Sequence, residues 1–231
     1  KVALGASATA NDGRRTVGFE ALLRWHHPRR GTLSPADFLP LAETLALMDE
    51  LTEMVVDQAL RQLRQWRERG LATSLAINIS AVNLHAADFT DRLVQCCRDA
   101  GIPPENLTIE LTETAAMADP VKAMDILTRL RLKGFRLSID DFGTGYSSLV
   151  QLQRLPFSEL KIDRALVADC ALSRQSRLIV KTAIDLAQNL GLAACAEGIE
   201  DAATLAVLEE LGCDFAQGYH ISRPLAAPQA E

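Results

Sequence analysis

The stretch VGFEALLRWHHP, residues 17–28, decides the fold class of this chain. Its apolar and β-branched residues over 17–24 predict a strand, and the segment WHHP follows directly. A doubly wound sheet that binds a dinucleotide carries a glycine-rich turn after its first strand. Because no such turn is present here, the stretch favours a (β/α) barrel over a doubly wound sheet.

Short strand patterns alternate with longer amphipathic patterns along the rest of the chain, which is typical of an α/β fold. Further strands are expected at 74–80, 107–111, 136–140, 159–162, 192–196 and 214–218, with a weaker run near 2–9 that pairs beside the first. Helices are expected at 36–48, 50–69, 88–100, 120–133, 145–154, 173–190 and 201–211, and the final PLAAPQAE as a tail. No low-complexity linker divides the chain, so we expect a single domain over residues 1–231.

The composition excludes several classes of protein. A formal net charge of −6 does not attract nucleic acid or an anionic membrane surface, so we expect neither DNA binding nor membrane contact. The cysteines are odd in number, 5 in all, and contain no C-x-x-C pair, which argues against a disulfide framework and a zinc knuckle. The chain begins at Lys1 without an initiator methionine, which indicates a fragment of a longer protein. We expect this segment to be cytoplasmic, whether or not the whole protein is anchored to a membrane.

Polar side chains stand at the carboxyl end of every confident strand. They are Glu20, Asn78, Glu110, Asp140 with Asp141, Lys161, Glu197 and Gln217. In a barrel these strand ends converge on one mouth, where five carboxylates repel one another unless cations neutralise them. Carboxylate and amide oxygens suit Mg²⁺ or Mn²⁺, and two such ions would suit phosphoester hydrolysis.

Other interpretations of single residues remain open at this point. Any one acidic residue after a strand is often a helix cap. Lys161 could pair with Asp163 for structure, or form a Schiff base as in an aldolase or lyase. The segment DDFGTGYSSL, residues 140–149, contains the letters DFG, but no other kinase motif accompanies it. We interpret it as a mobile loop with two glycines, and a plain turn capped by Ser147 is the alternative.

Five motifs occur in a fixed order: EALLRW at 20–25, DDFGTGYSSL at 140–149, LKID at 160–163, AEGIE at 196–200 and QGY at 217–219. PADFLPLAE follows the first of them, and NIS and ELTE lie before the second. From Val17 to Leu225 this ordered set strongly resembles the EAL-domain cyclic-di-GMP phosphodiesterases of bacteria. Each motif alone is weak, whereas the whole set is very specific.

The resemblance implies an α/β fold, a modified TIM (β/α)8 barrel with one antiparallel strand, that hydrolyses cyclic-di-GMP to linear pGpG with two Mg²⁺ or Mn²⁺ ions. It implies metal ligands at Glu20, Asn78, Glu110, Asp140, Asp141 and Glu197, with Asp140 bridging the ions. Lys161 would hold the attacking water, and Glu197 is also a candidate base. Substrate contacts are implied at Leu22, Arg24, Gln217 and Asp163, and loop support from Glu113 and Glu200.

The chain departs from the family pattern in two places. Leu4-Gly5-Ala6 replaces a common Y-Q-P segment, and ETLALMDEL at Glu43–Leu51 replaces the usual E-T-G-L-I continuation. The metal and lysine positions are intact, so an active phosphodiesterase is favoured over a domain that binds cyclic-di-GMP without turnover. The resemblance also implies a homodimer.

Overall fold

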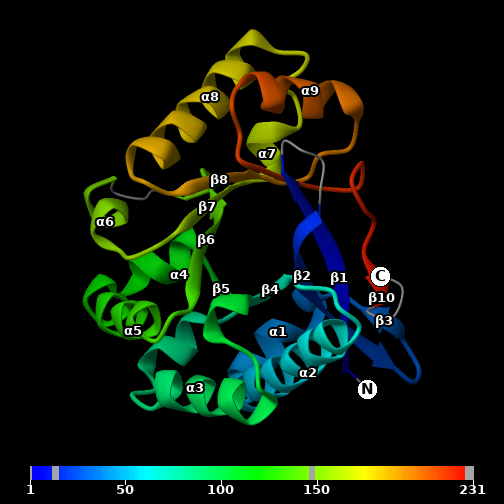
Figure 1. Cartoon of the computed structure of the whole chain (residues 1–231), viewed down its shortest axis with the longest axis vertical. Coiled ribbons are helices and arrows are strands. Elements are labelled where there is room, and N and C mark those ends of the chain that lie inside the picture. The colour runs from blue at the N-terminus through cyan, green and yellow to red at the C-terminus, as the bar shows by residue number, and fades with distance from the viewer. Residues whose placement is uncertain (1, 12–15, 146–148, 227–231) are drawn as a thin grey trace.

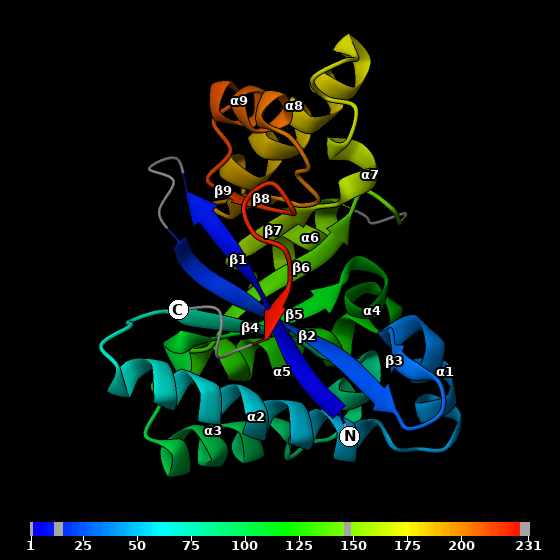
Figure 2. The same ribbon diagram turned by 90° about the vertical axis from the view of Figure 1, so that its right-hand side faces the viewer.

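The computed structural model describes residues 2–11, 16–145 and 149–226 of the chain. Eight strands form a closed barrel: β1 (Val2–Asn11), β2 (Thr16–His27), β4 (Ser74–Asn78), β5 (Leu107–Thr112), β6 (Arg136–Phe142), β7 (Glu159–Ile162), β8 (Ala193–Ala196) and β9 (Phe215–Gln217). Neighbours from β2 through β9 pair in parallel, whereas β1 pairs antiparallel with both β2 and β9 and so closes the barrel. Figure 2 shows β1 and β2 as two long strands that run across the molecule, where they pair antiparallel.

The helices surround this sheet on its outer side (Figure 1). They are α1 (Pro35–Thr44), α2 (Met48–Glu68), α3 (Phe89–Ala100), α4 (Glu113–Ala118), α5 (Pro120–Leu132), α6 (Leu149–Arg154), α7 (Arg164–Val167), α8 (Arg174–Asn189) and α9 (Ala202–Glu210). Short 3₁₀ turns η1 (Ala81–His85) and η2 (Pro104–Asn106) and two small edge strands, β3 (Gly31–Leu33) and β10 (Leu225–Ala226), complete the chain. Within the described ranges, none of these helices has both the length and the apolar character that a bilayer crossing requires.

The barrel confirms the predicted fold class, and each expected strand is present. The weak run near 2–9 is the antiparallel strand, β1. Two local expectations were wrong. The helix expected over 36–48 ends at Thr44, because the chain turns at Ala46, whose φ of 55° is left-handed, before α2 begins. The tail starts later than expected, because Leu225 and Ala226 pair with β1; residues 227–231 lie outside the described part.

Successive side chains of each strand point alternately to the packed core between sheet and helices and to the inside of the barrel. On β4, Leu75 and Ile77 are 2% and 0% exposed and belong to the core between sheet and helices, whereas Ser74 and Ala76 point inward and stay partly exposed. On β2, Phe19 packs against Trp66 of α2, with ring centroids 4.7 Å apart. Since successive side chains of a strand point to opposite faces, Glu20 next to Phe19 must point into the barrel.

Candidate active site

The polar residues predicted at the strand ends come together at the carboxyl end of the barrel. The parallel register explains why: Asn78 of β4 is the partner of Glu110 of β5, and Asp140 of β6 is the partner of Thr112 two residues later. The set comprises Glu20, Asn78, Glu110, Asp140, Asp141, Lys161, Glu197 and Gln217. Seven segments far apart in sequence therefore contribute to one site.

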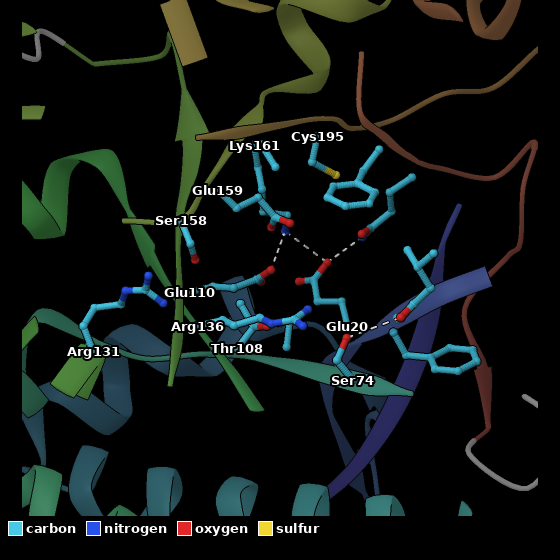
Figure 3. A pocket seen from close by; sticks show the side chains of 17 residues that line it. Glu20, Ser74, Thr108, Glu110, Arg131, Arg136, Ser158, Glu159, Lys161 and Cys195 are labelled. Carbon is cyan, nitrogen blue, oxygen red and sulfur yellow. Dashed lines mark hydrogen bonds and ion pairs between the residues drawn. The ribbon is translucent and has the colours of Figure 1, made fainter. Parts of the chain in front are cut away.

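The ammonium group of Lys161 lies at the centre of this site, and the residue as a whole is 2% exposed (Figure 3). Its Nζ is 2.7 Å from Glu197 Oε1, 3.1 Å from Glu110 Oε1, and 3.4 Å from Glu20 Oε2 and Asp140 Oδ1. Burial by itself would lower the pKa of Lys161, but these carboxylates outweigh it and hold that pKa well above its ordinary value. The lysine is therefore a fixed positive charge.

This arrangement decides between the interpretations of Lys161. The alternative of a structural pair with Asp163 is wrong: Asp163 Oδ1 instead accepts a hydrogen bond from Ala165 N at 2.8 Å and begins α7. A Schiff base needs a neutral amine. The raised pKa argues against the aldolase alternative, because the ammonium keeps its proton.

Glu20 is held by amide donors as well as by the lysine. Gln217 Nε2 donates to Glu20 Oε2 at 2.6 Å, and Asn78 Nδ2 donates to Glu20 Oε1 at 2.9 Å and to Glu110 Oε2 at 3.2 Å. Although burial tends to raise it, the pKa of Glu20 is lowered by the charge of Lys161 and these bonds. With its nitrogen engaged by two carboxylates, Asn78 could offer its amide oxygen to a cation.

Asp140 and Asp141 follow each other in sequence, yet both face the same cluster. The pairing of β6 with β7 is interrupted between Ile139 and Phe142, and Asp141 has a φ of 55°. This bend brings one oxygen each of Asp140, Asp141 and Glu197 within 4.8 Å of one another. A regular strand would send two neighbouring side chains to opposite faces, so the bend is what lets both aspartates reach the cluster.

The charges of this cluster fit a divalent cation. Burial and the neighbouring Asp140 raise the pKa of Asp141. Burial raises the pKa of Glu197 to about 8, although Lys161 opposes the shift. Burial also raises the pKa of Glu110 well above its usual range, again against the effect of Lys161. One lysine does not balance the carboxylates, and a cation bound to their oxygens would stabilise the ionised forms.

Glu113 begins α4 and lies against the loop that follows Asp141. Its Oε2 accepts a hydrogen bond from Gly143 N at 2.9 Å, and its side chain is 2% exposed. A Cβ atom at Gly145 would lie 2.7 Å from Glu113 Oε1, so the loop approaches this carboxylate closely, and a larger residue there would require the Glu113 side chain to shift. Tyr146, Ser147 and Ser148, the rest of the predicted loop, are outside the described residues.

Glu113→Ala is expected to raise the Mg²⁺ concentration needed for half-maximal activity and to lower turnover, by about 10- to 100-fold, the usual effect of removing a residue that supports metal ligands. The reason is that Gly143 loses its acceptor two residues after Asp141. Glu113→Gln, which keeps an oxygen acceptor, is the matched control and should retain most activity. Rate against Mg²⁺ concentration is the measurement; superimposable wild-type and alanine curves would make Glu113 a structural residue only.

The predicted substrate residues of β2 line a cleft of about 580 Å³ beside the cluster. Leu22 and Arg24 follow Glu20 at intervals of two and so share its face of the strand. The cleft extends to α1, α2, η1 and α4. It is large enough for part of a dinucleotide, and Asn78 is the predicted metal ligand that lines it.

Glu200 lies on the loop that carries Glu197. Its Oε1 is 2.9 Å from Arg164 Nη2, and both side chains are exposed. Arg164 also covers Gly198, where an added Cβ would meet Arg164 Cγ at 2.4 Å, and whose φ of 67° suits glycine. Glu200 thus contacts Arg164, the side chain that packs on the turn after Glu197, and its support of that turn stays a prediction.

Asn83 was not predicted from the sequence. Its side chain is 1% exposed and makes three hydrogen bonds. Its Oδ1 accepts hydrogen bonds from Thr52 Oγ1 and Ser80 N, both at 3.1 Å, and its Nδ2 donates to Asp49 Oδ1 at 2.9 Å. These bonds tie the segment after Asn78 to α2. Ser80 and Asn83 form a capping box for η1, and that spacing in the sequence was the available signal.

Comparisons with known proteins give a consistent result. The sequence model described as "EAL domain" matches residues 9–224. The chain is 42% identical over 214 residues to the bifunctional diguanylate cyclase/cyclic di-GMP phosphodiesterase MucR of Pseudomonas aeruginosa, covering 92% of this chain and 31% of MucR. It is 36% identical over 216 residues to the cyclic di-GMP phosphodiesterase RocR of the same organism, covering 94% of this chain and 55% of RocR.

A solved structure described as the PaMucR phosphodiesterase in complex with c-di-GMP superposes with a TM-score of 0.95 and 39% identity, covering 100% of this chain and 94% of that one. The EAL domain of Mycobacterium smegmatis DcpA superposes with a TM-score of 0.86 and 30% identity, covering 100% and 96% of the two chains. The chain thus spans about a third of MucR and just over half of RocR.

Proposed function

Because the chain belongs to the EAL domain family, we propose that it is a metal-dependent phosphodiesterase that hydrolyses cyclic di-GMP to linear pGpG. One observation carries the proposal: an all-oxygen ligand set gathers around a buried lysine, and Asn78 of that set also lines a nucleotide-sized cleft. Relatives that are named as cyclic di-GMP phosphodiesterases cover nearly the whole of this chain. The location of the segment in the cytoplasm and its assembly as a homodimer stay predictions.

Two Mg²⁺ or Mn²⁺ ions would be held by Glu20, Asn78, Glu110, Asp140, Asp141 and Glu197. When bound, they supply positive charge that lowers the pKa of a water molecule and neutralises the phosphate. The chain's own residues do the rest. Lys161 donates a hydrogen bond that orients the attacking water, Glu197 is placed to take its proton, and Gln217 holds Glu20 in position.

Substrate binding is assigned to the cleft. Arg24 contacts a phosphate group of the substrate, and Leu22 packs against the nucleotide beside it. Asp163 accepts a hydrogen bond at the start of α7, directly after the strand that carries Lys161. Any effect of Asp163 on substrate binding therefore passes through the backbone between β7 and α7. The binding of anionic substrate by a chain of net charge −6 depends on the cations and on Arg24.

The test is incubation of the protein with cyclic di-GMP and Mn²⁺, followed by chromatography of the nucleotides. Conversion to pGpG supports the proposal. Tight binding of cyclic di-GMP with no product after prolonged incubation would contradict it and assign the chain to the alternative role, a cyclic-di-GMP-binding regulatory domain. Glu20→Gln, which removes one carboxylate charge at the strand end, is the control variant and should yield no pGpG.

A further inference from the structure

A cavity of about 290 Å³ lies inside the barrel beneath the carboxylates (Figure 3). Glu110 and Lys161 of the active site line its upper part, and Ser158, Ala193 and Arg136 from the amino-terminal ends of their strands line its lower part. We call it the axial chamber. It shares Glu20, Glu110, Lys161 and Gln217 with the active site but no lining residue with the substrate cleft.

Small inward-facing side chains create the chamber. The residues two positions before Glu20, Asn78, Glu110 and Glu197 are Gly18, Ala76, Thr108 and Cys195, and all of them line it. Residues two apart on a strand share a face, so these four lie in the layer directly below the site, together with Glu159 and Phe215, which stand two positions before Lys161 and Gln217. TIM barrels usually fill such layers with bulky branched side chains. Here the layer leaves room along the barrel axis.

The walls of the chamber suit water. Glu159 points into it and accepts a hydrogen bond from Ser138 Oγ at 2.8 Å, and Thr108 and Ser158 add hydroxyl groups. A cavity needs only about 10–15 Å³ per water and a few polar partners to be hydrated, so this one has room for a file of several waters. Arg131 and Arg136 line its lower end and are both exposed, which places an opening there.

We propose that the axial chamber is a second water entrance, through which water reaches Lys161 from the barrel end opposite the substrate cleft. The inference rests on the proposed function. Bound substrate would cover the carboxylates from the cleft side, and each hydrolysis consumes one water molecule. Lys161 faces the chamber, so a water held there is in reach of the ammonium group while substrate occupies the cleft.

Ala193 offers a way to close the chamber without touching the site. It pairs with Glu159 in the β7–β8 ladder and lies four residues before Glu197. Ala193→Leu fills the chamber, and Ala193→Val fills less of it. Ala193→Ser is the matched control, because serine is small and adds a hydroxyl group to the wall. We expect kcat to fall at least about tenfold in the leucine variant, less in the valine variant and not in the serine variant.

Three readouts separate this effect from structural damage. The dissociation constant for cyclic di-GMP with Ca²⁺ and the melting temperature should change little, and crystals of the metal-loaded protein should show ordered waters in the wild-type chamber that are lost in Ala193→Leu. Unchanged kcat in a leucine or valine variant whose chamber waters are lost would overturn the proposal, as would a chamber that is dry in the wild type. If the wild-type protein produces no pGpG at all, the proposed function fails, whereas the crystals still report on hydration.

Discussion

Lys161→Met is expected to lower turnover of cyclic di-GMP about 10²- to 10³-fold, the effect of removing one donor aimed at developing charge, with affinity changed only several-fold. Methionine matches the lysine side chain out to Cε and removes the ammonium group that contacts Glu20, Glu110, Asp140 and Glu197. Turnover with Mg²⁺ and affinity with Ca²⁺ are the measurements. Equal losses in the two would make Lys161 a substrate anchor.

The same variant should also be less stable when no metal is bound. Removing one partner of a buried ion pair costs about 3–5 kcal/mol, and in a domain of this size each 1 kcal/mol shifts the melting temperature by about 2–4 °C, so a fall of about 10 °C is expected. Lys181→Met is the control, because Lys181 pairs with Asp185 on the surface and such pairs contribute little. Mg²⁺ should recover part of the loss in the Lys161 variant. A melting temperature equal to that of the wild type in EDTA would contradict the central role of the lysine.

EDTA is expected to abolish hydrolysis, and Mg²⁺ or Mn²⁺ to restore it. The cluster of Asp140, Asp141 and Glu197 has oxygen ligands and raised pKa values for two of its three members, which a bound cation would lower again. Ca²⁺ should support binding of cyclic di-GMP but little turnover, because its larger and looser coordination shell holds water and phosphate poorly in line.

A melting curve recorded in EDTA is the control for this experiment, since it shows whether the protein without metal is still folded. Calorimetric titration of Mn²⁺ into the wild type and into Asp141→Asn then tests the ligand set directly, and the variant should bind the ion more weakly. Hydrolysis that survives thorough chelation would contradict the two-metal mechanism, and brisk turnover with Ca²⁺ would contradict the geometric argument.

Local patterns in the sequence were enough to locate the barrel strands and most of the helices. The reason is that periodicity and end signals depend on backbone geometry within one element. The polar residues at the strand ends were also identified in this way. The strands have packed outer faces and a partly exposed inner face, as Ile77 and Ala76 on β4 illustrate.

Shorter elements and irregular turns could not be predicted in the same way. The helices α4 and α7 have only six and four residues, too few for a periodic pattern to be visible. The turn at Ala46 contains neither glycine nor proline, so nothing in the local sequence marks the end of α1 at Thr44. Asn83 is a polar residue whose partners lie on a helix about thirty residues earlier.

Which residues meet in the site was decided by closure of the barrel. Glu20 and Lys161 are separated by 141 positions in sequence and lie on strands that do not pair with each other, yet their charged atoms are 3.4 Å apart. Asp163 was an equally good partner for Lys161 on local grounds, but it lies past the strand end and begins a helix instead. The chain therefore carries the chemistry of the site as single residues at strand ends. Their distances, their pKa values and the chamber beneath them arise only when eight strands close around one axis, because side-chain contacts across a barrel depend on register and not on sequence separation.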